Sequence, residues 1–150
     1  MSKIKVVKGE IHIDRRGKIA SLNNFRFDGV NRVYFITHPN IEIIRGWHGH
    51  KLEKKWFYCV KGVFTIGLVE IDDWDNPSKS LKPTLHLISD NDSQIICIPE
   101  GYASCIKAEV PDSTLMVLSG KTMEDAQATP DSYRWDPNYW FDWKSLYTEE

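Results

Sequence analysis

Short runs of alternating or β-branched apolar residues, separated by turn residues, recur along most of the chain. Such runs predict strands rather than helices, because the side chains of a strand alternate between two faces. The pattern predicts nine strands, at residues 10–13, 32–37, 41–45, 56–60, 63–70, 84–88, 94–98, 105–108 and 114–118. Several runs are apolar at consecutive positions, which is typical of strands covered on both faces. We therefore expect an all-β domain of the sandwich or barrel type.

Outside these strands, one loop and the C-terminal segment stand out. Residues 72–83 form a polar, proline-containing loop that is longer than a hairpin needs. Residues 123–128 are the one stretch expected to form a helical turn. From Thr129 onward the chain is dense in aromatic residues, namely Tyr133, Trp135, Tyr139, Trp140, Phe141 and Trp143. A disordered tail contains few aromatics, so we expect this segment to pack against its own barrel or against a second subunit.

Length and composition limit the classes of protein that fit. A chain of 150 residues, 41% of them hydrophobic, suits one domain over residues 1–150, with the barrel at about 10–120 and a packed tail at about 121–150. The net charge of −2 lacks the basic excess that nucleic-acid binding requires. No apolar run approaches the ~20 residues of a membrane span. Cys59 and Cys97 lie in apolar runs and Cys105 makes the number of cysteines odd, which indicates reduced thiols and a cytoplasmic protein.

The densest group of chemically competent side chains lies at residues 45–51, which read Arg-Gly-Trp-His-Gly-His-Lys. Side chains two positions apart in an extended chain point the same way, so His48 and His50 can both face a barrel interior. An unperturbed imidazole has a pKa near ~6.5, which suits a base at neutral pH. Gly46 and Gly49 let a ligand approach the backbone closely. We expect both histidines to be catalytic.

A metal site is the first function to test for this histidine pair. The metal sites of cupin barrels combine His-x-His with a Glu four or five residues later and a further histidine in Pro-x-Gly-x-x-His. Here Lys54 and Lys55 occupy the Glu positions, and Ser104 stands in place of the further histidine. An ammonium group repels a cation and offers it no lone pair. We expect no metal and no cofactor, whereas bound iron or nickel would indicate a cupin oxygenase.

Over roughly residues 10–120 the sequence resembles the metal-free cupins that act on nucleotide-linked sugars. Asp14-Arg15-Arg16-Gly17 resembles their Asp-x-Arg-Gly motif, in which the arginine binds the nucleotide's phosphates. Arg45-Gly46-Trp47-His48 resembles the Arg-Gly-x-His of dTDP-4-dehydrorhamnose 3,5-epimerases, whose histidine is the catalytic base. Lys55 matches an active-site lysine of the same enzymes. The resemblance implies a jelly-roll (cupin) barrel, followed here by the aromatic-rich C-terminal segment.

The resemblance to dTDP-sugar 3,4-ketoisomerases is at least as close. Residues 32–36 precede residues 45–51 at the spacing seen in those enzymes, in which both histidines and a tyrosine line the active site. This resemblance implies that Tyr34 is a catalytic residue together with the two histidines. The sequence falls between the two groups of enzymes. Residues 114–118 lack the acid tyrosine of the epimerases, and Lys55 replaces the glutamine that is usual in the ketoisomerases.

Both reactions begin with the same elementary step, the removal of a proton from the carbon beside a ketone. This step needs a base and a group that stabilises the enolate oxygen, commonly worth a few kcal/mol in a dry pocket. His48 or His50 would be the base, with Lys55 and Tyr34 near the oxyanion. Return of the proton to the opposite face gives epimerisation, and return to the neighbouring carbon moves the ketone.

We therefore expect a metal-independent isomerase or epimerase of a nucleotide-linked 4-keto-6-deoxy sugar, used in surface polysaccharide biosynthesis. Its expected partners are a dTDP-linked sugar and a second copy of the chain, because the resembling families dimerise by exchanging N-terminal strands. The expected substrate-binding residues are Arg16, Arg45, Lys55 and Ser104. The alternative is a non-catalytic cupin domain that binds a nucleotide-sugar or glycan. The sequence leaves open the sugar, the nucleotide, the place of proton return and which histidine is the base.

Overall fold

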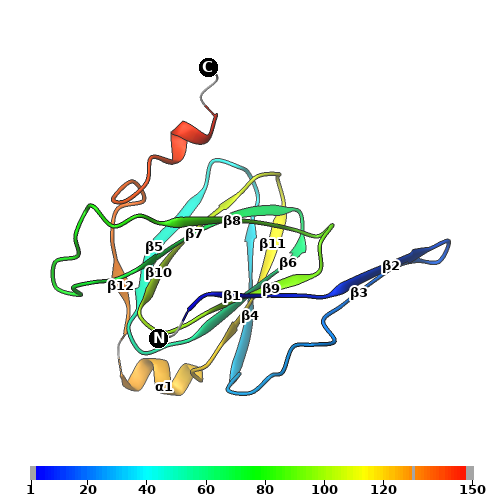
Figure 1. Ribbon diagram of the computed structural model, residues 1–150, viewed down its shortest axis with the longest axis horizontal. Helices are drawn as coiled ribbons and strands as arrows, with labels where there is room; N and C mark the ends of the chain where they lie inside the picture. The colour runs from blue at the N-terminus through cyan, green and yellow to red at the C-terminus, as the bar shows by residue number, and fades with distance from the viewer. Residues whose placement is uncertain (1–2, 130, 148–150) are drawn as a thin grey trace.

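The computed structural model describes residues 3–129 and 131–147, and these residues form mainly β-strands (Figure 1). In chain order the strands are β1 (Lys5–Lys8), β2 (Glu10–Asp14), β3 (Gly17–Ser21), β4 (Arg32–His38), β5 (Ile44–His50), β6 (Lys55–Lys61), β7 (Val63–Glu70), β8 (Thr84–Ser89), β9 (Gln94–Ile98), β10 (Tyr102–Ala108), β11 (Ser113–Ser119) and β12 (Tyr133–Arg134). The helices are α1 (Met123–Ala128) and the 3-10 helix η1 (Trp143–Tyr147). In the described part of the chain, neither helix is long and apolar enough to cross a membrane.

Two five-stranded antiparallel sheets face each other and enclose the core. One sheet has the order β1-β9-β6-β11-β4, and the other has the order β12-β5-β10-β7-β8. Within the described part of the chain, strands β2 and β3 pair only with each other, and this hairpin projects away from the barrel (Figure 1). The all-β architecture that the sequence predicts is confirmed.

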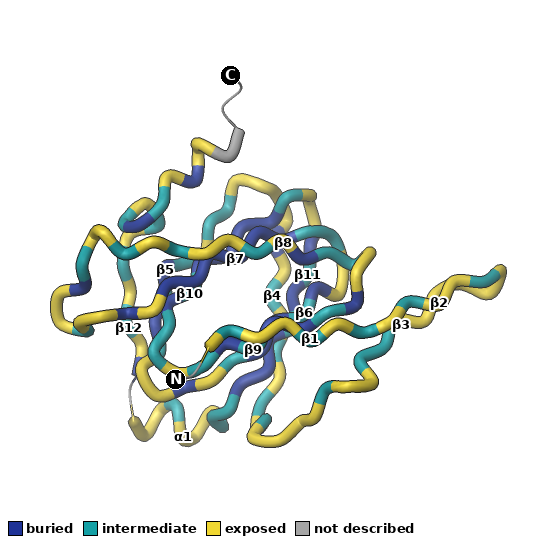
Figure 2. The backbone as a smooth tube through the Cα atoms, viewed as in Figure 1, coloured by how far each residue is buried: buried dark blue, intermediate teal, exposed yellow. Residues whose placement is uncertain are grey.

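Apolar side chains from the inner faces of both sheets fill the barrel. The buried cluster between the sheets includes Phe57, Phe64, Ile66, Ile96, Leu115 and Val117. In Figure 2 the buried backbone lies mainly in the barrel strands, while the projecting hairpin is mostly exposed and has no buried residue. Strand β7 is buried over nearly its whole length, because the core covers one of its faces and the C-terminal segment covers the other.

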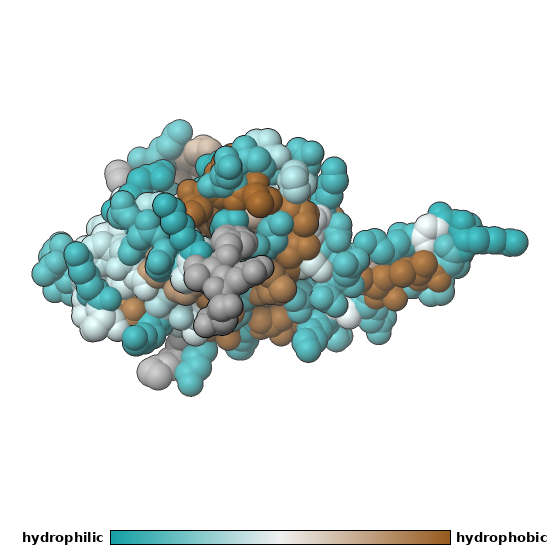
Figure 3. Space-filling view, turned by 90° about the horizontal axis from the view of Figure 1, so that it is seen from above, coloured by the Kyte–Doolittle hydropathy of each residue, from teal (hydrophilic) through white to brown (hydrophobic). Residues whose placement is uncertain are grey.

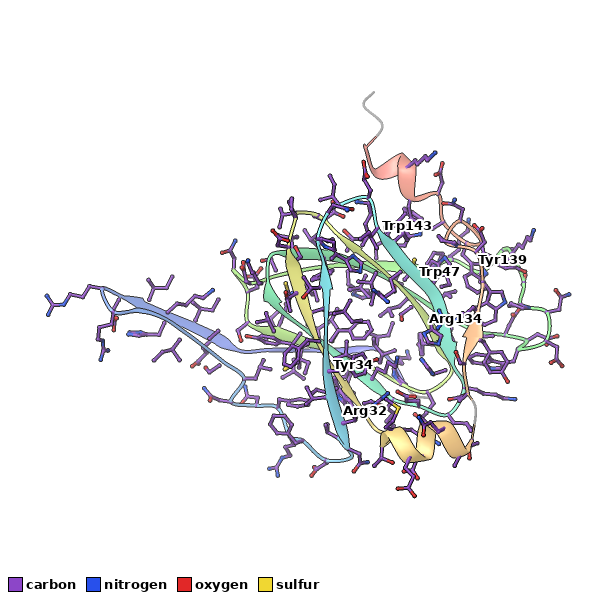
Figure 4. The ribbon with its side chains drawn as sticks, turned by 180° about the vertical axis from the view of Figure 1, so that it is seen from behind. Arg32, Tyr34, Trp47, Arg134, Tyr139 and Trp143 are labelled. Atoms are coloured by element: carbon purple, nitrogen blue, oxygen red, sulfur yellow. The ribbon has the colours of Figure 1, made fainter. Side chains whose placement is uncertain are left out.

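The aromatic tail packs against the outer face of the sheet that contains β5, β10 and β7. Trp47, Trp140 and Trp143 form a second buried cluster there with apolar residues of the sheet, and Figure 4 shows Trp47 and Trp143 together between β5 and the tail. The indole N–H groups of Trp47 and Trp143 both donate to the Pro137 carbonyl, each at 2.9 Å. A Cβ at Gly67 would lie 2.8 Å from the Trp47 ring, so this close approach requires glycine.

The tail therefore packs on its own barrel, which confirms one of the two predicted arrangements. Residues 130 and 148–150 of the predicted tail lie outside the described residues.

Eight of the nine predicted strands lie within observed strands, and the helical turn predicted at residues 123–128 is α1. Thr122 caps this helix, since its hydroxyl accepts a hydrogen bond from the Asp125 N–H at 3.0 Å. The strand predicted at residues 41–45 is wrong, because residues 41–42 form a bend and β5 starts at Ile44 and ends at His50. Pairing with β10 on one edge and β12 on the other keeps the glycine-containing histidine motif extended. Strands β1, β3 and β12 are not among the nine predicted strands. All three are short, and each forms by pairing with another segment: β1 with β9, β12 with β5, and β3 with its hairpin partner β2.

The packing of the tail predicts a large loss of stability when Trp143 is truncated. Trp143 is 1% exposed, and Trp143→Ala should lower the free energy of unfolding by about 3–5 kcal/mol, because it opens a cavity between tail and sheet. Urea denaturation measures this loss. Leu87→Ala is the control, because Leu87 is 65% exposed on β8 and its truncation should change the free energy by less than about 0.5 kcal/mol. Equal losses in the two variants would contradict the structural role of the tail.

Candidate active site

Strand β5 places the two predicted catalytic histidines side by side inside the barrel. The ring centroids of His48 and His50 lie 4.3 Å apart, as expected for residues two positions apart in one strand. On the other edge of β5, β12 places Arg134 opposite His48. Strand β4 contributes Tyr34 and β6 contributes Lys55, from the facing sheet. In Figure 4 Tyr34 and Arg134 lie on opposite sides of the barrel opening.

Two cavities adjoin this histidine pair, and Tyr34, His48 and Lys55 line both of them. The first, here called the arginine-side cavity, has a volume of about 410 Å³, and its polar lining comprises Tyr34, Thr37, Arg45, His48, Lys55, Ser104 and Arg134. The second, here called the helix-side cavity, has a volume of about 560 Å³ and extends toward α1. Its lining includes His50, Glu53, Asp131 and Ser132. The predicted residues Tyr34, Arg45, His48, Lys55 and Ser104 thus meet at one cavity.

The hydrogen bonds of His50 define its tautomer. Its Nδ1 lies 3.0 Å from the main-chain carbonyl oxygen of Asp131. A carbonyl can only accept a hydrogen bond, so Nδ1 carries the proton and Nε2 of the neutral ring keeps its lone pair. Among the described residues Nε2 is buried and has no hydrogen-bond partner. His50 therefore lines the helix-side cavity as a neutral ring whose buried Nε2 is unprotonated.

A buried carboxylate lies behind His50. Glu53 is 5% exposed, and its Oε1 lies 3.6 Å from His50 Nδ1. Its Oε2 accepts a hydrogen bond from the Ser119 hydroxyl at 2.6 Å and lies 3.6 Å from the Arg32 guanidinium. These partners compensate for the cost of burying the charge of Glu53. The carboxylate is placed to stabilise a proton that His50 gains during a reaction.

Both imidazoles are neutral in the ligand-free protein at pH 7. Burial lowers the pKa of His48 to about 3, and the neighbouring His50 and the Lys55 ammonium act in the same direction. Burial also lowers the pKa of His50 to about 4, again with a contribution from Lys55. The Nε2 of His48 lies 2.7 Å from the Ser132 hydroxyl, so this nitrogen is already hydrogen-bonded. Of the buried nitrogens of these two rings, Nε2 of His50 is the one without a hydrogen-bond partner among the described residues, whereas the tautomer of His48 depends on whether the Ser132 hydroxyl donates or accepts.

Tyr34 and Lys55 form a hydrogen-bond donor pair beside the histidines. The Lys55 ammonium donates to the Tyr34 hydroxyl at 3.1 Å, which leaves the hydroxyl proton of Tyr34 free to be donated to a ligand. The Arg32 guanidinium lies 4.9 Å from the centroid of the Tyr34 ring. This arrangement can stabilise an oxyanion that forms next to His48 or His50.

The arginine-side cavity is strongly cationic. Arg45, Lys55 and Arg134 line it, and its described lining contains no carboxylate. Ser104 of β10 lies opposite His48 of β5 in the sheet register, so its hydroxyl faces the same space. Guanidinium groups form paired hydrogen bonds to phosphate oxygens. The cavity is therefore suited to a diphosphate.

The structure does not bring Arg16 to these cavities within one chain. Arg16 lies near the tip of the projecting β2–β3 hairpin, where its guanidinium pairs with the Asp14 carboxylate at 2.7 Å. Its side chain is 81% exposed. If Arg16 binds the substrate, as the sequence resemblance implies, it does so from another copy of the chain.

Four further site residues were not identified from the sequence: Glu53, Asp131, Ser132 and Arg134. Glu53 had a local signal, since it follows His50 by three residues. The other three belong to the tail, and only the pairing of β12 with β5 places them beside the histidines. Across residues 3–129 and 131–147, no group of three or more His, Cys, Asp or Glu side chains could hold a metal ion.

The FdtA family model, described as WxcM-like, C-terminal, matches residues 2–135, whereas no curated protein matches the chain. The fold is similar to that of the RmlC epimerase of Mycobacterium tuberculosis, with a TM-score of 0.72 and 24% identity over 94% of this chain and 74% of that chain. These values confirm the predicted cupin barrel.

Two ketoisomerases have similar folds. The 3,4-ketoisomerase of Helicobacter canadensis has a TM-score of 0.67 and 16% identity, over 93% of this chain and 96% of that chain. QdtA, a sugar 3,4-ketoisomerase of Thermoanaerobacterium thermosaccharolyticum in complex with TDP, has a TM-score of 0.65 and 23% identity, over 91% of this chain and 90% of that chain. A mutant of QdtA was solved in complex with TDP-4-keto-6-deoxyglucose.

The lowered pKa values predict that both rings stay neutral at pH 6 in the ligand-free protein. Because each ring binds a proton in the unfolded chain below about pH 6.5 but not in the folded one, the free energy of unfolding should decrease as pH falls from 6.5 toward 4. Nitrogen NMR shifts of the imidazoles, assigned with His48→Asn and His50→Asn, measure protonation directly. A titration midpoint near 6.5 for either ring would show that burial does not control its charge.

Proposed function

The chain belongs to the FdtA, or WxcM-like, family, and we propose that it is a 3,4-ketoisomerase that moves the ketone of a dTDP-linked 4-keto-6-deoxy sugar from C4 to C3. The observation that carries this proposal is the buried, unprotonated Nε2 of His50 at a cavity with a second neutral imidazole. The similar folds of two ketoisomerases, one of them in complex with TDP, support it.

The reaction starts with His50 as the base. Its Nε2 takes the proton from C3 of the sugar, and the electron pair of the C–H bond forms the C3–C4 double bond while the ketone oxygen becomes an oxyanion. The Tyr34 hydroxyl and the Lys55 ammonium stabilise this oxyanion. The Glu53 carboxylate, 3.6 Å from Nδ1, stabilises the protonated His50.

The second half of the reaction returns the proton to the neighbouring carbon. The hydroxyl proton moves from O3 to O4 within the enediolate, and His50 then delivers its proton to C4 while the O3 oxyanion becomes the ketone at C3. Atoms and charge balance without an oxidant or a reductant. One base that reaches both carbons suffices, which agrees with the absence of a tyrosine in residues 114–118, the strand that holds the acid of the epimerases.

The cationic arginine-side cavity supplies the binding energy for the nucleotide part of the substrate. Arg45 and Arg134 bind the diphosphate, with Lys55 between the diphosphate and the sugar. The same ammonium disfavours a divalent cation at the histidine pair. The proposed enzyme is therefore independent of a metal, and its product would supply surface polysaccharide biosynthesis.

The projecting hairpin supports the further proposal that two copies form a dimer. Ile13 and Ile19 on this hairpin are 72% and 62% exposed, and Figure 3 shows an apolar patch along it. Exposed apolar side chains on a projecting pair of strands favour association with another chain. In such a dimer the hairpin of one copy carries Arg16 to the cavity of its partner.

Turnover in deuterated water tests the proposed reaction. With TDP-4-keto-6-deoxyglucose, the protein should yield a 3-keto product, as followed by proton NMR, with deuterium at C4 to the extent that the proton on His50 exchanges with solvent before its return. His50→Asn should lower kcat by at least about 1,000-fold, because it removes the base. EDTA should leave the rate unchanged.

His86→Asn is the matched control for this experiment, because His86 bonds to Thr84 on its own strand and does not line either cavity. It should retain the rate of the unmodified protein. Deuterium at C3 or C5 with inverted configuration would instead identify an epimerase. Binding of TDP-sugar without any exchange would identify the non-catalytic alternative, and either result would contradict the proposed reaction.

Mixing two inactive variants tests whether Arg16 acts on the partner's site. Arg16→Ala and His50→Asn should each be nearly inactive alone. Random exchange of subunits would give dimers with one intact composite site and recover about a quarter of the original activity. No recovery after subunit exchange would contradict the composite site, and full activity of Arg16→Ala alone would show that Arg16 does not bind substrate.

A further inference from the structure

We propose that Asp131 is a positioning residue that holds His50 in the orientation and tautomer needed for proton transfer. Asp131 lies in the segment that connects α1 to β12, outside the barrel strands. It touches no reacting atom in the proposed reaction and acts through His50. This inference rests on the proposed function, but it makes a separate claim about the free protein.

Asp131 forms hydrogen bonds to three consecutive residues at the end of β5. Its carboxylate accepts the backbone N–H groups of Lys51 at 2.8 Å and Leu52 at 2.7 Å. Its main-chain carbonyl accepts the Nδ1–H of His50 at 3.0 Å. Asp131 is 9% exposed, so water competes weakly for these bonds. We call this set of three hydrogen bonds the Asp131 clamp.

The side-chain bonds of the clamp place the main-chain carbonyl that sets the tautomer. The two N–H groups fix the carboxylate against the turn after His50, and this fixes the carbonyl of the same residue against the imidazole. The carbonyl itself remains in any variant of Asp131. Only its position depends on the side chain, so a substitution tests positioning and leaves the acceptor in place.

The negative charge of Asp131 also favours proton uptake by His50. The Asp131 carboxylate and its carbonyl both raise the pKa of His50, against the larger opposing effect of burial. The carboxylate thus makes the neutral ring a better proton acceptor. Glu53 Oε1 lies 3.6 Å from the same nitrogen, longer than a hydrogen bond, so it can accept the Nδ1 proton only if the ring or the carboxylate moves.

The neighbouring residues show that the clamp belongs to a larger contact between tail and barrel. Tyr133 and Arg134 pair with Gly49 and His48 of β5, and the Ser132 hydroxyl lies 2.7 Å from His48. Those contacts hold the strand and the other ring. Among the described residues of this segment, Asp131 hydrogen-bonds to His50 and to the turn after it, so of the two rings its substitution should affect mainly that of His50.

The test compares Asp131→Ala and Asp131→Asn with Asp90→Ala, in the full-length chain. Asp90 is a matched control because its carboxylate also accepts a backbone N–H, that of Gly62 at 2.9 Å, at the end of β6 remote from Lys55. Two measurements are made on each variant. Steady-state kinetics with TDP-4-keto-6-deoxyglucose separate kcat from KM, and long-range proton–nitrogen NMR gives the His50 tautomer without ligand.

For Asp131→Ala we expect kcat to fall about 10–100-fold, as for partners that orient a functional imidazole, with KM within about twofold of its original value. The population of the Nδ1-protonated tautomer of His50 should fall as well. Asp131→Asn, which keeps one acceptor oxygen, should lie between this variant and the unmodified protein, and it replaces Asp131→Ala if that variant does not fold. Asp90→Ala should leave both measurements unchanged.

The two measurements separate this inference from the proposed function. If the unmodified protein does not turn over the sugar, the NMR comparison still decides the inference, and an unchanged His50 tautomer in a folded Asp131 variant overturns it. If the protein is active, an unchanged kcat in both Asp131 variants overturns it. An equal loss of kcat in Asp90→Ala would also overturn it, because the effect would then be structural.

Discussion

Hydrogen bonding along both edges of β5 is the constraint on which the site depends. Strand β10 pairs with one edge and β12 with the other, so the histidine motif is held in extended form. Because side chains alternate along a strand, His48 and His50 face the cavities while Trp47, fully buried, faces the aromatic tail. One strand therefore joins the chemistry on its inner face to the packing of the tail on its outer face. The tail in turn holds β5 in place, because β12 pairs with the edge of β5 and also brings Arg134 to the cavity.

The burial that stabilises the barrel also sets the protonation of the site. Two imidazoles 4.3 Å apart, with an ammonium nearby, cannot both be charged at low cost when water is excluded. They remain neutral, and a neutral imidazole with a free Nε2 is a base. Glu53 and the Asp131 carboxylate lie behind His50, while the cations Arg45, Lys55 and Arg134 lie on the arginine side. Negative charge thus supports proton uptake at the base, and positive charge meets an anionic substrate.

The sequence predicted what depends on local pattern. Alternating apolar residues predicted eight of nine strands, and the two-residue spacing of the histidines predicted that their rings lie together. The predicted bounds of β5 were wrong because its glycine-rich motif has low strand propensity. This motif is extended because it pairs with segments far along the chain. Asp131, Ser132 and Arg134 could not be assigned for the same reason. They acquire a role only when β12 adds to the edge of β5, and no local pattern predicts which segment adds there.

The proposed reaction requires His50 to take the proton from C3 of the sugar without help from a metal ion. A crystal structure of His50→Asn in complex with TDP-4-keto-6-deoxyglucose would show whether the sugar lies in the position that this step needs. We expect the C3 hydrogen of the hexose to point at the side chain of position 50, with the ketone oxygen beside Tyr34 and the diphosphate between Arg45 and Arg134. A hexose that lies away from position 50, or one whose opposite face meets it, would exclude His50 as the base.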